Sequence, residues 1–480
     1  MAGVGFELRK LFKNNDGYVD NIKAYSISAI VTEGPMFLCI FMLLMLKTLI
    51  GKFNGTYFEK HLFIVVITYS MIFSMLFSNT INMFVSRYIS DCIYEKRYDD
   101  ILSAFYSSVI FVLLFGGTTA GIFIYKLQLN LLYKIIIFTQ FNIIMVTWMQ
   151  LTFLSAIKKY MNILKGFFIA VTLAIILALA LMVLDINPLL SALLGNMSGY
   201  FILLSIFMIE IKGFYPADNI DIFKILGAVD KYKILVFIGV IGTLGLYGHN
   251  FIMWTSDYSE SILEKIRFCI MYDVPAFYAS LTITLMLVMF TVSLETNFYI
   301  KFRDYFDCIL CGGRLKDIKL AHKNMVNVLM NEILKLCNVQ LFFTIIAAVF
   351  GVTILQYVGM DSNMSYIFRI LCFGYYFYGV QRSIVIILLY FDDKAGALIT
   401  ECIFFAFSVI LTVLSKNAGI DYYGLGFLFG GAIAAFSAFI RLQYYVKNLE
   451  YNVFCRQPLF IETNKGIFTR LSERLSNRIS

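Results

Sequence analysis

Residues 62–86 read LFIVVITYSMIFSMLFSNTINMFVS and contain no charged side chain. A helix needs about 20 mainly apolar residues to cross the hydrocarbon core of a bilayer, so this stretch predicts a transmembrane helix. The whole chain of 480 residues has the same character, with 60% hydrophobic and 15% charged residues. Soluble domains carry about 25% charged residues. The composition therefore predicts a polytopic membrane protein and excludes a secreted enzyme, a cytosolic enzyme and a disordered scaffold.

Eleven further stretches predict membrane spans. Eight of them carry no charge, and three reach the required length only with ionisable residues inside: Glu33 in the first span, Arg369 and Arg382 in the tenth, and Glu401 in the eleventh. The twelve predicted spans are residues 24–46, 62–86, 101–125, 135–157, 166–184, 186–209, 234–256, 274–294, 339–360, 366–391, 396–415 and 422–440.

The distribution of basic residues predicts the orientation. With the N-terminus inside, 30 of the 39 Lys and Arg residues fall in the cytoplasmic head, loops and tail, and 9 fall on the outer side. Basic residues are retained on the cytoplasmic side of membrane proteins, so we expect both termini to be cytoplasmic. Topology and attraction to anionic lipid account for the net charge of +8, and no nucleic-acid partner is expected.

The spacing of charged connections indicates two halves of six spans in one orientation, as in transporters built from parallel repeats. We expect an all-α fold in which two six-helix bundles enclose a central cavity. Tyr215-Pro216 is expected to end the sixth helix, and amphipathic helices are expected along the inner membrane face after residue 299. The predicted parts are an amphipathic segment (1–23), a first bundle (24–213), a linker (214–232), a second bundle (233–447) that includes a cytoplasmic connection (299–337), and a cytoplasmic tail (448–480).

Ionisable residues within spans are costly in hydrocarbon and are therefore candidates for function. Glu33 precedes Pro35, which removes a helical hydrogen bond beside the carboxylate. Glu33 either binds a cation, a proton or polar cargo, or is satisfied inside the bundle. Arg382 and Glu401 lie on consecutive spans and are expected to form an ion pair.

The outer end of the seventh span carries His249, Asn250 and Trp254, and an acidic loop follows. His249 either packs through hydrogen bonds or takes part in a transport pathway. The acidic loop either attracts a cationic cargo or is an ordinary solvated loop.

Motifs for enzymatic chemistry are scarce. No Walker sequence occurs, the three His residues fall in separate regions, and Cys308-Ile-Leu-Cys311 lacks the second pair of a zinc site. The nine Cys residues do not form a disulfide framework. We therefore expect no enzymatic activity, no metal and no cofactor.

Four short sequences resemble one family of membrane transporters. They are MAGVGFELRKLF at residues 1–12, GHNFIMW at 248–254, YDVPAFY at 272–278 and ETNFY at 295–299. They are similar to the PelG family, in the polysaccharide branch of the multidrug/oligosaccharidyl-lipid/polysaccharide (MOP) exporter superfamily. The resemblance covers the whole chain.

This resemblance implies export of Pel, a partly deacetylated and therefore cationic amino-sugar polymer, or of its precursor, across the cytoplasmic (inner) membrane for biofilm matrix. It also implies as partners a cytoplasmic glycosyltransferase and membrane subunits that include a cyclic-di-GMP receptor. The candidate pathway residues are Glu33, His249, Asn250, Trp254, Tyr272, Asp273, Glu295, Arg382 and Glu401. No residue is expected to be catalytic.

Other interpretations remain open at this point. The chain is alternatively a cation-coupled multidrug exporter of the same superfamily, or an enzyme or scaffold of a polysaccharide synthase complex that docks through residues 299–337. Carboxylates would suit a cationic sugar, whereas neutral sugars would need amides and aromatic faces. The candidate amide side chains are Asn79, Asn82, Gln140, Asn142 and Gln150.

Overall fold

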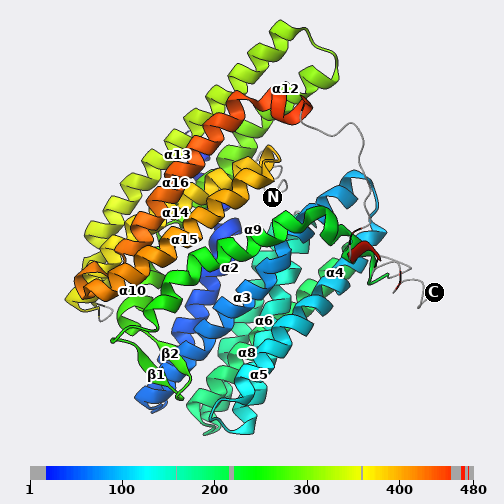
Figure 1. The fold of residues 1–480 in the computed structure, drawn as a ribbon. Helices are drawn as coiled ribbons and strands as arrows, with labels where there is room; N and C mark the ends of the chain where they lie inside the picture. Colours follow the sequence, from blue (N-terminus) through cyan, green and yellow to red (C-terminus); the bar gives the residue numbers. More distant parts are fainter. Residues whose placement is uncertain are drawn as a thin grey trace. The chain divides into compact units, whose positions relative to one another are not determined.

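The computed structural model describes residues 18–157, 159–215, 221–357, 360–455, 466, 468–470 and 474. The segment 1–12, most of the predicted tail and part of the predicted linker lie outside the described residues. Backbone polar groups in hydrocarbon must bond within their own segment, so an apolar chain of this kind forms helices. Figure 1 shows a nearly all-helical protein with one short hairpin of two strands.

The elements follow one another with short connections. They are α2 (Tyr18–Lys52), α3 (Tyr57–Tyr94), α4 (Asp99–Val112), η1 (Leu113–Gly117), α5 (Thr118–Tyr125), α6 (Leu131–Ile157), α7 (Tyr160–Val183), α8 (Pro188–Phe214), α9 (Lys224–Met253), β1 (Glu260–Ile262), β2 (Ile266–Phe268), α10 (Ile270–Leu281), α11 (Thr284–Ser293), η2 (Leu294–Phe298), α12 (Tyr299–Leu310), α13 (Leu315–Tyr357), α14 (Ser362–Tyr390), α15 (Lys394–Ala418), η3 (Ile420–Tyr422), α16 (Leu425–Lys447) and η4 (Tyr451–Cys455).

Each predicted span lies on helical elements of the structure. By length and composition, eleven helical runs among the described residues could cross a membrane. The remaining predicted span, 234–256, lies on α9, which is helical to Met253 and kinked at Tyr232. The sixth helix ends at Phe214, directly before Tyr215-Pro216, as predicted. Helix α2 continues through Pro35, so the proline beside Glu33 does not end it.

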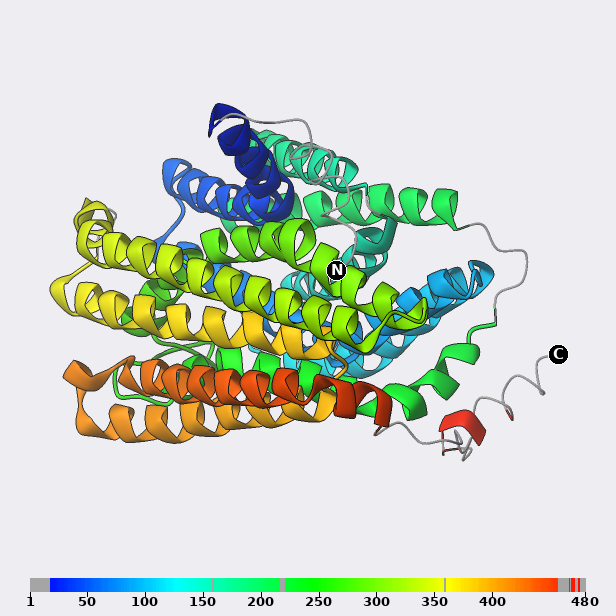
Figure 2. The same ribbon diagram turned by 90° about the horizontal axis from the view of Figure 1, so that it is seen from above.

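The internal contacts divide the chain into two compact units. Unit 1 comprises Met1–Thr32, Gly245–Glu260 and Cys269–Phe460, and unit 2 comprises Glu33–Leu244, Ser261–Phe268 and Ile461–Ser480. The divisions fall inside α2 and inside α9. In unit 1, helices α13 to α16 run side by side, as Figures 1 and 2 both show. In unit 2, α8 packs against α6 and α7, and α3 packs against α6.

Glycines allow the last two helices of unit 1 to approach closely. A Cβ at Gly426 of α16 would lie 2.3 Å from the backbone nitrogen of Thr412 in α15. One turn further, a Cβ at Gly430 would lie 2.7 Å from the Cα of Ser408. Small residues spaced four apart let two membrane helices pack backbone to backbone.

In unit 2, glycines likewise allow the last two helices of the first six spans to approach closely. A Cβ at Gly195 of α8 would lie 2.7 Å from the carbonyl oxygen of Ala174 in α7, and one at Gly199 would lie 2.8 Å from the Ala174 Cβ. Thus the fifth and sixth spans pack like the eleventh and twelfth. This shared packing supports the predicted internal repeat more directly than the charged loops do.

The connection after span eight differs from the sequence prediction. Instead of turning to run along a membrane face, α13 continues as one helix of 43 residues. At 1.5 Å per residue it is about 65 Å long, roughly twice the hydrocarbon thickness. The helices α12 and α13 therefore form a hairpin that extends the spans, with Gly312 at a positive φ of 72° in its turn.

The acidic loop that follows α9 contains the β1–β2 hairpin. Residues 261–268 of this hairpin belong to unit 2. The Tyr69 hydroxyl of α3 lies 2.5 Å from the carbonyl oxygen of Arg267, and Gln128 donates a 2.8 Å hydrogen bond to Glu264. Lys265 donates to the carbonyl oxygen of Lys126. The hairpin is therefore a packed element rather than a free solvated loop.

Substitution of Gly426 tests the close packing of α15 and α16. We expect Gly426→Ala to lower the melting temperature of the purified protein, because the added methyl group overlaps backbone atoms; overpacking of this kind costs about 1–3 kcal/mol. Gly213→Ala is the matched control, since a Cβ at Gly213 meets nothing within 4 Å. Equal melting temperatures for the two variants would contradict the packing described here.

Candidate functional site

Two of the family-like sequences meet around one carboxylate in unit 1. Asp273, in the first turn of α10, accepts hydrogen bonds from Asn250 Nδ2 at 2.7 Å and Trp254 Nε1 at 2.8 Å. The backbone N–H of Cys269 donates a third bond, at 2.9 Å, to the same carboxylate. The side chains come from the end of α9 and the start of α10, so residues 248–254 and 272–278 form a single site.

His249 and Tyr272 extend this site into an aromatic cluster. His249 Nδ1 lies 2.8 Å from the Tyr272 hydroxyl. The imidazole ring packs on Phe427 of α16 with 4.1 Å between ring centroids, and Tyr375 of α14 lies beside both rings. Both His249 and Tyr272 are fully buried. The cluster therefore ties the C-terminal part of α9 to α10, α14 and α16.

The burial of Asp273 determines what this cluster can do. Only 7% of Asp273 is exposed, and three N–H donors occupy its oxygens. A buried charge is tolerated where hydrogen bonds replace its hydration, and each charge-assisted bond is stronger than a neutral one. Most of the hydrogen-bonding capacity of Asp273 is thus already used, and in this structure it positions the chain rather than offering a carboxylate to a cargo.

Arg382 and Glu401 form the ion pair that the sequence predicts. Arg382 Nη1 of α14 lies 2.7 Å from Glu401 Oε1 of α15, and Glu401 is fully buried. The pair joins two consecutive helices. Removal of one partner would leave the other charge buried and unpaired, which is the costly case.

A second buried ion pair was not predicted from the sequence. Asp393 precedes α15 and accepts two hydrogen bonds from Arg441 of α16, at 2.7 Å and 2.9 Å. The same carboxylate caps α15 by accepting from the Gly396 N–H at 3.0 Å. The signal available in the sequence was Asp393 at the N-cap position before an apolar run, but its partner lies 48 residues further along.

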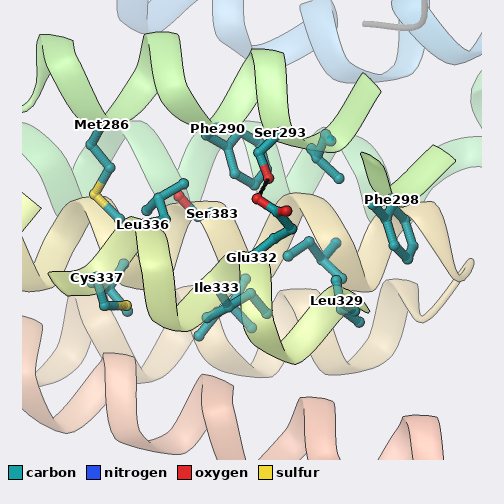
Figure 3. A pocket seen from close by; sticks show the side chains of 14 residues that line it. Met286, Phe290, Ser293, Phe298, Leu329, Glu332, Ile333, Leu336, Cys337 and Ser383 are labelled. Atoms are coloured by element: carbon teal, nitrogen blue, oxygen red, sulfur yellow. Dashed lines mark hydrogen bonds between the residues drawn. The ribbon is translucent and has the colours of Figure 1, made fainter. Parts of the chain in front are cut away.

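Glu295 lies in η2, a π-helical turn between α11 and α12, and its side chain lies outside the described part of the structure. Near it the structure shows Glu332 of α13, which the sequence analysis missed. Glu332 accepts hydrogen bonds from Ser293 Oγ at 2.9 Å and Asn297 Nδ2 at 2.7 Å. Figure 3 shows Glu332 and Ser293 beside a cavity of about 20 Å³. That volume fits a water molecule and not a sugar ring.

Glu33 is half-buried in α2, in unit 2. It is remote in sequence from Asp273, Arg382 and Glu401, which belong to unit 1. All nine Cys residues are free thiols, Cys308 and Cys311 included. Among the described residues, no three His, Cys, Asp or Glu side chains come together in a group that could hold a metal ion.

Comparison with solved structures relates this fold to known transporters. A MOP-superfamily transporter from Pyrococcus furiosus aligns with a TM-score of 0.60 at 11% identity, over 89% of this chain and 96% of that one. An outward-facing multidrug resistance MATE family transporter also gives 0.60 at 11% identity, over 90% and 96%. The bent form of the Vibrio cholerae MATE transporter VcmN gives 0.58 at 12% identity, over 92% and 98%. No curated protein matches.

The fold is therefore that of the MOP-superfamily transporters. A family model described as "PelG: Putative exopolysaccharide Exporter (EPS-E)" matches residues 1–454. The chain belongs to the PelG family of exopolysaccharide exporters.

Asp273→Asn tests the buried cluster. The amide lacks the charge that holds three donors and brings N–H groups of its own, so we expect a loss of stability of about 1–3 kcal/mol or more, seen as a lower melting temperature. Asp257→Asn, at an exposed position between α9 and β1, is the control and should melt like the unaltered protein. An unchanged melting temperature for Asp273→Asn would show that the three hydrogen bonds do not support the fold.

Proposed function

We propose that this transporter exports a Pel-type amino-sugar exopolysaccharide, or its precursor, across the cytoplasmic membrane for the biofilm matrix. Membership of the PelG family over residues 1–454 carries this proposal. The family-like sequences also support it, because two of them, 248–254 and 272–278, build one buried cluster instead of lying at unrelated positions. The residues that resemble the family are thus residues that shape this fold.

In this proposal both termini are cytoplasmic, and two six-helix bundles, residues 24–213 and 233–447, enclose the export path. The count of 30 basic residues against 9 supports the orientation. The polymer would be supplied by a cytoplasmic glycosyltransferase acting with membrane subunits that include a cyclic-di-GMP receptor. The long hairpin of α12 and α13 supports such docking, since its tip exposes Leu310 and Leu315 next to basic residues.

The buried charges play different parts in this proposal. Asp273 is held by three N–H donors, and Arg382 and Glu401 pair with each other, all inside unit 1, so these residues hold helices together. Glu33 is the predicted pathway carboxylate that is half-buried within a span of unit 2. A carboxylate in that position is suited to the amine groups of a partly deacetylated sugar or to a coupling cation.

Glu33→Gln tests this assignment in cells that depend on the chain for surface polymer. Because the amide keeps the shape but loses the charge, we expect normal protein levels in the membrane and a several-fold loss of polymer at the cell surface, measured by lectin binding. Glu260→Gln, an exposed carboxylate in the external hairpin, serves as the control and should leave polymer levels unchanged.

Two results would count against the proposal. Unchanged surface polymer in the Glu33 variant at equal protein level removes Glu33 from the path. Normal surface polymer in cells that lack the chain altogether contradicts export by this protein, and increased sensitivity of such cells to cationic drugs would favour the multidrug alternative.

A further inference from the structure

We infer that unit 2 contains a binding track for uncharged sugar groups, formed by side chains of α3, α6 and α9. The track consists of Thr243, Asn79, Asn82 and Thr152, with Trp148 beside them. Asn79 Nδ2 donates to Thr243 Oγ1 at 3.1 Å, and Asn82 Nδ2 donates to Asn79 Oδ1 at 3.1 Å. Thr152 Oγ1 donates to Asn82 Oδ1 at 3.0 Å. Three consecutive hydrogen bonds thus connect three helices, all of which Figure 1 labels.

The backbone fixes the position of this track. A Cβ at Gly239 of α9 would lie only 2.2 Å from the carbonyl oxygen of Asn79, so α9 and α3 approach closely at this point. Thr243 follows Gly239 by one helical turn on the same face, and it is therefore held opposite the Asn79 amide. The track is built into the helix packing and does not depend on a loop.

The track retains capacity for more hydrogen bonds. Each Asn amide has two N–H donors, and Asn79 and Asn82 each donate one hydrogen bond among the described residues. Both side chains and Thr152 are half-buried, with part of their surface accessible, and all three lie within predicted spans. An amide facing hydrocarbon is costly, so this face is suited to water or to a polar ligand.

Trp148 adds an aromatic surface to the track. It precedes Thr152 by one turn on the same face of α6, is half-buried, and is oriented by a 3.1 Å hydrogen bond from its Nε1 to Ser74 Oγ. Ligand sites combine apolar or aromatic walls with a few fixed polar groups. A flat ring next to amides and hydroxyls offers that combination to a sugar ring.

The chemistry of the track identifies the class of ligand. None of its five side chains is ionisable, so it offers hydrogen bonds and no charge. Hydroxyl and acetamido groups form such bonds with Asn and Thr, whereas an ammonium group would be expected to need a carboxylate. The inference rests on the proposed function: in a partly deacetylated polymer, the acetylated sugars would occupy the track and the amine-bearing sugars would lie elsewhere.

Fluorescence of the purified full-length protein tests the track directly. The chain has two Trp residues, Trp148 and Trp254, so Trp148→Phe separates their signals. With fully N-acetylated amino-sugar oligomers we expect a saturable change in emission that is absent from Trp148→Phe. Fully deacetylated oligomers should bind more weakly, because their ammonium groups meet no carboxylate in the track.

Two variants and a control make the test specific. Loss of one hydrogen-bonding group in Asn82→Leu or in the nearly isosteric Thr152→Val should weaken binding of the N-acetylated oligomer by roughly tenfold. Thr172→Val is the control, because Thr172 lies on α7 of the same unit and its hydroxyl donates to the carbonyl oxygen of Phe168 in its own helix. Its affinity should match that of the unaltered protein.

Three outcomes would contradict the proposed track. They are an emission change that persists in Trp148→Phe, an affinity of Thr152→Val for the N-acetylated oligomer equal to that of the unaltered protein, or tighter binding of the deacetylated oligomer than of the N-acetylated one. The proposed function fails by a different result, namely surface polymer in cells without the chain. If those cells lack polymer but Asn82→Leu restores it fully, the export function stands and the track alone is contradicted.

Discussion

The structure depends on one constraint: in hydrocarbon, every polar group must find its partner inside the protein. The backbone meets it by forming long helices, of which α13 is a continuous 43 residues. Charged side chains meet this constraint by forming hydrogen bonds and ion pairs. Asp273 accepts three N–H bonds, and Glu401 is paired with Arg382. Because each arrangement joins separate helices, the groups that are most costly to bury are also the groups that fix the packing.

This constraint distinguishes polar side chains that hold the helices together from polar side chains that are available to a ligand. In unit 1, Asp273, Arg382 and Arg441 bond to groups of the same unit, although Glu401 Oε2 and His249 Nε2 are buried without a hydrogen-bond partner among the described residues. In unit 2, Asn79 and Asn82 are half-buried, with part of their surface accessible, and retain hydrogen-bonding capacity. Polar groups that are unsaturated and accessible are better candidates for cargo contacts than the charged residues that stand out in the sequence.

Hydropathy predicted the spans, since burial in lipid depends on local composition alone, and the Arg382–Glu401 pair followed from adjacent spans. Other features depend on how distant segments pack. No local pattern indicates that Asp273 accepts hydrogen bonds from side chains of α9, or that Arg441 pairs with Asp393, 48 residues away. Likewise, Asn79 was a candidate amide, but its link to Thr243 requires the close approach at Gly239. The position of a span is determined by the local sequence, whereas the partner of a polar side chain is determined by tertiary packing.

Export by this chain is the central claim, and a flux assay in proteoliposomes measures it most directly. Purified protein is reconstituted into vesicles, labelled partly deacetylated amino-sugar oligomers are supplied on one side, and their appearance on the other side is followed. The account predicts protein-dependent, saturable flux that exceeds the leak of protein-free vesicles. Flux equal to that leak, with correctly folded protein and with ion gradients of either direction imposed, would contradict it.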